Sequence, residues 1–268
     1  MQVVLLQLDI QWKDIQENIR RAEMLMGKHP GADLYVLPEM WSTGFLTDIQ
    51  EGNSPDDVRS AEQVIEHEQD SIALRWMQEQ ARRCACALSG SLAVRLHDGS
   101  CRNRHYFMTP DHVFFYDKHH LFSYGHEDDS YQAGQTHTVV AWKEFRFLLL
   151  TCYDLRFPVW SRYGLAGEYD AIIYVANWPS SRIPAWDVLT KARAIENQCY
   201  VIAVNRVGDD PLASYCGHSM VIDPIGRVVV ESDKNTEQAL FVPLSKASLD
   251  KARTRFRVLA DRDIVTLE

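Results

Sequence analysis

The stretch EFRFLLLTCYDLRFP, from Glu144 to Pro158, decides the fold. Its first half, Glu144 to Leu150, is rich in apolar residues, as is typical of a strand buried inside a sheet. Cys152 follows at the end of this strand, where the chain turns. Because α/β proteins place reactive side chains at strand ends, the stretch predicts an α/β fold with Cys152 at the edge of a buried sheet.

Two other segments repeat this order of strand, break and reactive residue. Glu39 follows the apolar segment Asp33–Leu37 and a proline, and Lys118 follows the apolar segment Val113–Tyr116. A carboxylate among apolar neighbours can act as a general base, an ammonium can stabilise an oxyanion, and a thiol can act as a nucleophile. Taken alone, Glu39 could be half of a buried ion pair, Lys118 a solvated turn residue and Cys152 a core residue. Together they predict a nucleophilic site.

The rest of the chain alternates between strand and helix patterns. Val3–Ile10 predicts a buried strand, and Asp14 predicts the cap of a helix that stops at Gly27. A polar surface loop begins at Glu51. The mixture of strand–helix–strand units and hairpins predicts a layered α/β sandwich, with residues 1–268 as one domain and a charged C-terminal extension from about 244.

Two later segments are predicted to be helical. The first is a short helix over Pro158–Leu165. The second helix covers Trp186–Gln198, and the helical spacing of its apolar residues places three of them inward: Leu189, Ala192 and Ile195.

The composition of the chain restricts the classes of partner that we expect it to bind. The formal net charge is −9, from 28 Lys and Arg against 37 Asp and Glu, which argues against nucleic-acid binding. The longest apolar runs, such as Ala171–Ala176, are far shorter than the ~20 residues that span a bilayer, so we expect no membrane partner. Six cysteines without a secretion signal are expected to be reduced thiols in a cytoplasmic protein.

The sequence gives no support for a metal or a cofactor. It contains no dinucleotide-binding glycine motif, phosphate-binding loop, His-Glu-x-x-His zinc motif or Gly-x-Ser-x-Gly elbow. Cys84 and Cys86 lack a second pair that would complete a tetrahedral site. The run His126–Asp129 is a less favoured candidate for a hard cation, because four adjacent residues seldom converge on one ion. We therefore expect neither a metal nor a cofactor.

Three segments, LPEMWSTGF, YDKHHLF and TCYDLRFP, resemble in this order the motifs of the nitrilase (carbon-nitrogen hydrolase) superfamily. The resemblance extends over almost the whole chain, including YVANWP, ARAIENQ and NRVG. It implies that Glu39, Lys118 and Cys152 form the family's catalytic triad. It also places the family's second glutamate at Glu127, for which a solvated acidic loop is the alternative.

The same resemblance implies a nitrilase-like α-β-β-α sandwich. We expect these four layers to form when two subunits pack, and therefore expect a homodimer or a higher homo-oligomer. Trp160 and the charged tail after Pro243 are candidates for its interfaces.

The residues beside the cysteine resemble the omega-amidase and deaminated-glutathione amidase branches of the superfamily. The segment Pro158–Arg162 and the run Asn177-Trp178-Pro179 look most like bacterial omega-amidases that act on 2-oxoglutaramate and 2-oxosuccinamate. The implied reaction is hydrolysis of a small-molecule amide through a thioester on the cysteine. The backbone N–H of Tyr153 is expected to assist the lysine in binding the oxyanion.

Such a substrate carries a carboxylate that the acidic protein must bind locally. Arg182 is a candidate for this role, with a surface arginine as the alternative, and Phe45 and Trp178 are candidate walls of the site that could equally be core. Arg156 and Arg193 are expected to be structural. Two other functions remain open: a sister amidase for deaminated glutathione or a carbamoyl compound, and a binding protein that retains the fold, which the intact triad disfavours.

Overall fold

The computed structural model describes residues 1–47 and 64–266, and within them the strands form two large sheets. The first sheet has the order β15-β1-β2-β4-β5-β6, with β3 beside β4, and the second has the order β14-β13-β10-β9-β8-β7. Strands β11 and β12 form a separate hairpin. The strands are β1 (Gln2–Gln7), β2 (Leu34–Val36), β3 (Glu66–His67), β4 (Ala87–Arg95), β5 (Cys101–Met108), β6 (Val113–Asp117), β7 (Val139–Trp142), β8 (Phe145–Thr151), β9 (Ala171–Ala176), β10 (Tyr200–Asn205), β11 (Val207–Asp209), β12 (Ser214–Cys216), β13 (Met220–Ile222), β14 (Val228–Glu231) and β15 (Gln238–Pro243).

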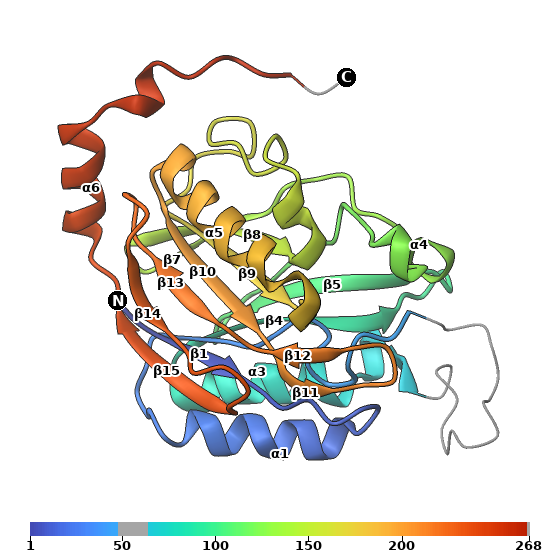
Figure 1. The fold of residues 1–268 in the computed structure, drawn as a ribbon. Helices are drawn as coiled ribbons and strands as arrows, with labels where there is room; N and C mark the ends of the chain where they lie inside the picture. Colours follow the sequence, from blue (N-terminus) through green and yellow to red (C-terminus); the bar gives the residue numbers. More distant parts are fainter. Residues whose placement is uncertain (48–63, 267–268) are drawn as a thin grey trace.

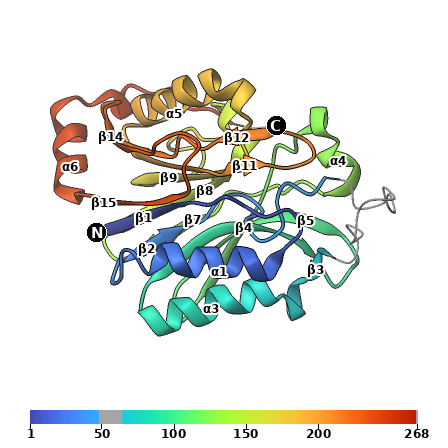
Figure 2. The same cartoon turned by 60° about the horizontal axis from the view of Figure 1, so that its bottom comes forward.

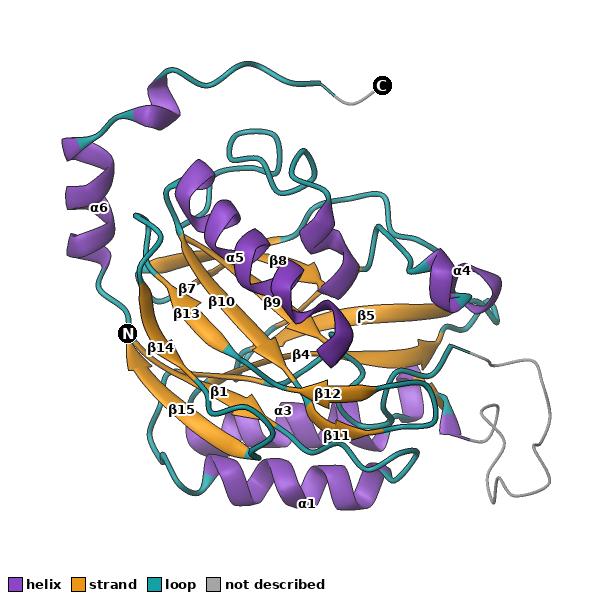
Figure 3. Cartoon of the chain, viewed as in Figure 1, coloured by secondary structure: helices purple, strands orange, loops and turns teal. Residues whose placement is uncertain are grey.

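The two sheets pack face to face, and helices cover their outer faces. Figures 1 and 2 show α1 (Ile15–Met26) and α3 (Ile72–Cys84) outside the first sheet, and α5 (Ile183–Asn197) outside the second. In Figure 3 the strands lie between these helices. The predicted α-β-β-α sandwich is thus confirmed, but the expectation that it needs two subunits is wrong, since one chain supplies all four layers.

Strand β1 shows why the chain can form these layers. Its alternate residues Val3 and Leu5 belong to the core between the two sheets, whereas Val4 and Leu6 pack in the core beneath α1 and α3. Side chains of a strand point alternately to its two faces, so a continuous apolar run fits only a strand that is covered on both sides. The uninterrupted apolar sequence of β1 therefore reflects its place in the middle of the sandwich.

The predicted helix boundaries near the N-terminus are confirmed. Asp14 caps α1 by accepting a hydrogen bond from the backbone N–H of Glu17, and the helix ends at Gly27. Most of the surface loop expected from Glu51 lies outside the described residues.

The predicted helix over Pro158–Leu165 is wrong. A short 3₁₀ turn, η3 (Cys152–Arg156), follows β8 instead, and residues 158–165 form turns. Their backbone groups form isolated turn hydrogen bonds, such as that from the N–H of Arg162 to the carbonyl of Val159, and also bond to side chains. The hydroxyl of Tyr169 donates to the carbonyl of Ser161, and the N–H of Tyr163 donates to Asn197 at 2.9 Å.

Helix α5 is confirmed, but its predicted inward face is wrong for Ile195 and only partly right for Leu189, which packs against the core, and for Ala192. Leu189 and Ala192 are only half-buried, and Ile195 is 52% exposed. The buried face instead carries polar residues, because it supports η3 through hydrogen bonds. Arg193 Nη2, for example, donates to the carbonyl of Leu155 at 2.6 Å. The residues buried on this face are Ile183, Trp186, Thr190, Arg193, Ala194 and Asn197.

The C-terminal part of the chain packs on its own subunit through α6 (Lys246–Arg255), whose Lys246 lies 2.5 Å from Asp170. The prediction that Trp160 lies at a subunit interface is wrong, because its ring is buried between His119 and His137, with centroids 3.6 and 3.8 Å away. In the part of the chain that the structure describes, every helix is too short or too polar to cross a membrane.

Candidate active site

The three residues of the predicted triad meet between the two sheets. Glu39 follows β2 and Lys118 follows β6 in the first sheet, whereas Cys152 follows β8 in the second. Lys118 Nζ lies 2.8 Å from Glu39 Oε1 and 2.7 Å from Glu127 Oε2. All four side chains are buried, so Glu127 is not part of a solvated acidic loop.

Local backbone geometry places the thiol. Cys152 has φ +44°, a conformation that is unusual for a residue with a side chain and that turns the chain sharply after β8. The carboxylate of Asp154 closes this turn by accepting a hydrogen bond from the backbone N–H of Thr151. The turn leaves Cys152 Sγ 3.9 Å from the carbonyl of Asn177, at the wall of a cavity.

Asp154 joins the turn of the cysteine to that of the lysine. Its Oδ2 accepts from the N–H of Thr151 at 3.0 Å and from the hydroxyl of Tyr116 at 2.8 Å. Its Oδ1 accepts from the N–H of His120 at 3.0 Å. Because one buried carboxylate binds both segments, it fixes Lys118 relative to Cys152.

Burial and the charged groups around the Cys152 thiol determine whether it rests as a thiol or as a thiolate. Burial raises the pKa of Cys152 well above the usual value, the negative charge of Glu39 adds to this rise, and Lys118 opposes it. The resting cysteine is therefore a neutral thiol that needs a base. Burial alone would lower the pKa of Lys118, but the charges of Glu127 and Glu39 outweigh it and raise that pKa, so the ammonium stays charged.

Sequence reasoning missed two asparagines that hold Glu39. Asn177 donates its backbone N–H to Glu39 Oε2 at 2.8 Å. Asn103, from β5, donates its side-chain N–H groups to Glu39 Oε1 and to Glu127 Oε1, both at 2.8 Å. Asn177 lies in a segment that was singled out for its resemblance, whereas Asn103 sits within a strand, where only the strand register reveals its neighbours.

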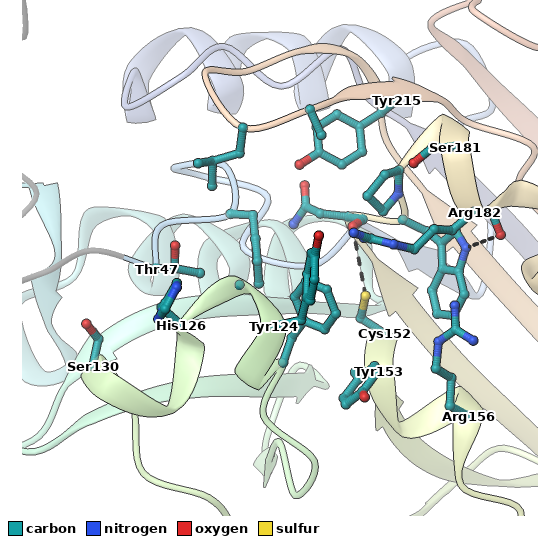
Figure 4. Close-up of a pocket in the computed structure, with 18 of the residues that line it drawn as sticks. Thr47, Tyr124, His126, Ser130, Cys152, Tyr153, Arg156, Ser181, Arg182 and Tyr215 are labelled. Carbon is teal, nitrogen blue, oxygen red and sulfur yellow. Dashed lines mark hydrogen bonds between the residues drawn. The ribbon is translucent and has the colours of Figure 1, made fainter.

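A cavity of about 770 Å³ opens over Cys152. It brings together the four predicted substrate-binding residues, and Figure 4 shows Tyr153 and Arg182 near the thiol. These four residues are Phe45, Tyr153, Trp178 and Arg182.

Two arginines face this cavity rather than one. Arg182 lies over the rings of Phe122 and Tyr124, at 5.1 and 5.4 Å from their centroids. Arg156 was expected to be structural, but it lines the cavity and lies 4.9 Å from the Trp178 ring centroid (Figure 4). No carboxylate of residues 1–47 or 64–266 forms an ion pair with either guanidinium. Arg193 is structural, as predicted, since it is buried against η3.

The acidic run beside the cavity does not form a cation site. Glu127 turns inward to Lys118, whereas His126 and Asp129 are exposed and pair with each other at 3.0 Å. Within the described residues, no group of three or more His, Cys, Asp or Glu side chains is arranged to hold a metal ion.

Comparison with known proteins gives consistent matches. The sequence model of the family described as carbon-nitrogen hydrolase matches residues 2–255. An omega-amidase of Yersinia enterocolitica is 38% identical over 265 residues, with 98% of this chain and 97% of the relative covered. A 2-oxoglutaramate amidase of Bacillus subtilis is 34% identical, with 85% of each chain covered.

Solved structures agree in fold. The crystal structure of a CN-hydrolase superfamily protein from Xanthomonas campestris, with an arsenic adduct in its active site, has a TM-score of 0.90 and 36% identity. The superposition covers 100% of this chain and 99% of that one.

Proposed function

This chain belongs to the carbon-nitrogen hydrolase family, and we propose that it cleaves the ω-amide of small 2-oxo dicarboxylic acid monoamides to the acid and ammonia. It is an omega-amidase-like hydrolase. We propose 2-oxoglutaramate and 2-oxosuccinamate as its substrates. The observation that carries the proposal is a buried thiol, beside a carboxylate and an ammonium, in a cavity that also holds two arginines, neither paired with a carboxylate of residues 1–47 or 64–266.

The proposed first half-reaction forms a thioester. Glu39 takes the proton of Cys152, and the thiolate attacks the amide carbonyl. The resulting oxyanion is stabilised by the Lys118 ammonium and by the backbone N–H of Tyr153. Tyr153 lies in the first turn of η3, where backbone N–H groups lack partners within the turn. The C–N bond then breaks, and ammonia leaves with the proton that Glu39 had taken.

The proposed second half-reaction hydrolyses the thioester. Glu39 removes a proton from water, the hydroxide adds to the acyl carbon, and the thiolate leaves and recovers the proton. Glu127 stays bound to Lys118 beside this step and keeps the ammonium in place. The carboxylate, the ammonium and the thiol supply base, electrostatic stabilisation and nucleophile, so we propose that no cofactor takes part.

The arginines support an anionic substrate. The protein carries a net charge of −9, so a carboxylate must be bound by local cations against the overall field. Arg156 precedes Trp178 in the sequence and Arg182 follows it, and both line the cavity. Their guanidinium groups can bind a carboxylate with paired hydrogen bonds. Phe45 and Trp178 supply apolar walls for the carbon chain between amide and acid.

A panel of amides scored by ammonia release tests the substrate. We expect the two 2-oxo acid monoamides to be turned over fastest. Faster ammonia release from deaminated glutathione or from a carbamoyl compound would favour the sister amidase activity. No ammonia release from any amide would favour a binding protein. A kinetic comparison of 2-oxoglutaramate with 2-oxosuccinamate then shows which length of substrate carbon chain the protein prefers.

We also propose that the chain assembles at least as a homodimer. Val188 and Ile195 on the outer face of α5 are 65% and 52% exposed, an apolar surface that a second copy could cover. Sedimentation of the purified protein tests this, and a monomer at micromolar concentration would contradict it.

A further inference from the structure

Asn103 occupies the point at which the two glutamates and the lysine meet. The backbone carbonyl of Asn103 accepts from the N–H of Lys118 at 3.0 Å, which fixes these residues opposite each other at the end of the β5–β6 pair. The Asn103 side chain is 1% exposed. Its position is thus set by the sheet, independently of the loops that carry the acids.

The side chain divides its two N–H groups between two carboxylates. Nδ2 lies 2.8 Å from Glu39 Oε1 and 2.8 Å from Glu127 Oε1. Lys118 Nζ binds the same two carboxylates, so two buried negative charges share one ammonium and one amide. This cluster has one negative charge more than it has positive charges, and neutral donors are the remaining means of stabilising it.

The other end of the Asn103 amide is its carbonyl oxygen, Oδ1. Oδ1 of Asn103 is buried and accepts no hydrogen bond within the described part of the chain. A buried acceptor without a donor is unfavourable, so a side chain selected only for packing would avoid it. The two N–H donors of Asn103 therefore account for an amide at this position.

We propose that Asn103 is a positioning residue, whose N–H groups hold Glu39 and Glu127 side by side as carboxylates. Glu39 is thereby held in place to take the proton of Cys152. The inference rests on the proposed function for the role of Glu39, but it concerns the protonation of the base rather than the identity of the substrate. The pKa of Glu127 is raised, chiefly by burial and also by the charge of Glu39, and the charge of Lys118 and the hydrogen bond from Asn103 oppose this rise.

The test replaces Asn103 with leucine, which has a similar shape and no donor. His105→Gln is the matched control, since His105 lies two residues along the same strand, is equally buried and bonds to Ser89 rather than to the acids. Each variant is assayed for kcat and KM with 2-oxoglutaramate over a range of pH. Alkylation of Cys152 by iodoacetamide is followed by mass spectrometry over the same range, because it needs the thiolate and no amide substrate.

In Asn103→Leu we expect the acid limb of both profiles to move up by about one pH unit, since a carboxylate without its donors binds a proton more tightly. At neutral pH kcat falls by about tenfold or more, and KM changes little. His105→Gln keeps the wild-type profiles. If the leucine variant does not fold, Asn103→Ser, whose hydroxyl cannot bridge both acids, is measured in the same way.

Profiles of the Asn103 variant that superimpose on those of the wild type would overturn the inference, as would a loss of kcat that only follows the loss of folded protein. The alkylation profile keeps this result separate from the proposed function. If wild-type protein releases no ammonia from any amide, the proposed function fails, while the pH dependence of alkylation still decides the role of Asn103.

Discussion

The carboxylate of Asp154 lies 2.8 Å from the ring Nδ1 of His120 and 3.0 Å from its backbone nitrogen, which joins the turn that carries Cys152 to the loop that carries Lys118. We predict that Asp154→Asn lowers the free energy of unfolding by ~1–3 kcal/mol, because buried donors lose a charged acceptor. We also predict that kcat falls about tenfold or more, because the thiol and the ammonium lose their common anchor. Urea denaturation and ammonia release measure the two effects.

Asp170→Asn is the matched control. Asp170 is also a buried carboxylate with several donors, including Lys246 and the N–H of Arg146, but it lies away from the cavity. We expect a similar loss of stability with kcat unchanged. Equal kcat losses in the two variants would contradict a specific role for Asp154.

Lys118 forms ion pairs with two buried carboxylates, Glu39 and Glu127, so its removal should be costly. We predict that Lys118→Met lowers the free energy of unfolding at neutral pH by ~3–5 kcal/mol, because it leaves buried charges unpaired. The loss should shrink at acid pH, where the carboxylates protonate. Lys246→Met, which removes a partly exposed ion pair with Asp170, should cost less than ~1 kcal/mol. A Lys118 variant as stable as this control would refute the prediction.

The two arginines of the cavity should act on substrate binding. We predict that Arg156→Ala and Arg182→Ala each raise KM for 2-oxoglutaramate by about 10–100-fold. This is the loss of affinity expected when a hydrogen-bonded ion pair with the substrate carboxylate is removed. KM for pentanamide, which has no carboxylate, should change by less than about threefold. Arg146→Ala, at an exposed ion pair with Glu168, serves as the control. An unchanged KM for the anionic substrate in either cavity variant would exclude that arginine from carboxylate binding.

A buried histidine should make the protein sensitive to acid. Burial lowers the pKa of His105 from 6.5 to about 3. Because the unfolded chain binds a proton below pH 6.5 and the folded protein does not, stability is full above that pH and falls toward pH 3, by up to ~1.4 kcal/mol per pH unit. We predict that His105→Gln flattens the dependence of unfolding free energy on pH in this window. Parallel curves for wild type and variant would contradict it.

The sequence predicted those site residues that lie in a recognisable local pattern. Glu39, Lys118 and Cys152 each end an apolar strand, so their grouping followed from the tendency of strand ends to meet at one edge. The short strands β3, β7, β11 and β12 were missed, because two to four residues carry too little periodicity to be recognised.

Features that depend on contacts between distant segments could not be predicted. The buried face of α5 is polar because Arg193 and Asn197 form hydrogen bonds with the chain in and after η3. The local sequence of α5 does not predict these contacts. Asn103 looks like one polar residue in a strand, and its function is visible only when β5 and β6 are paired. Arg156 was expected to be structural, and its place in the lining of the cavity could not be predicted, because that cavity is formed by segments distant in the sequence.

The central claim is that Cys152 carries the acyl group of the substrate during turnover. The most direct measurement mixes the protein with 2-oxoglutaramate, stops the reaction with acid within the first turnovers and identifies the modified peptide by mass spectrometry. We predict a 2-oxoglutaryl thioester on Cys152, and neither adduct nor ammonia release in a folded Cys152→Ala variant. Ammonia release by that variant at the wild-type rate would contradict the claim.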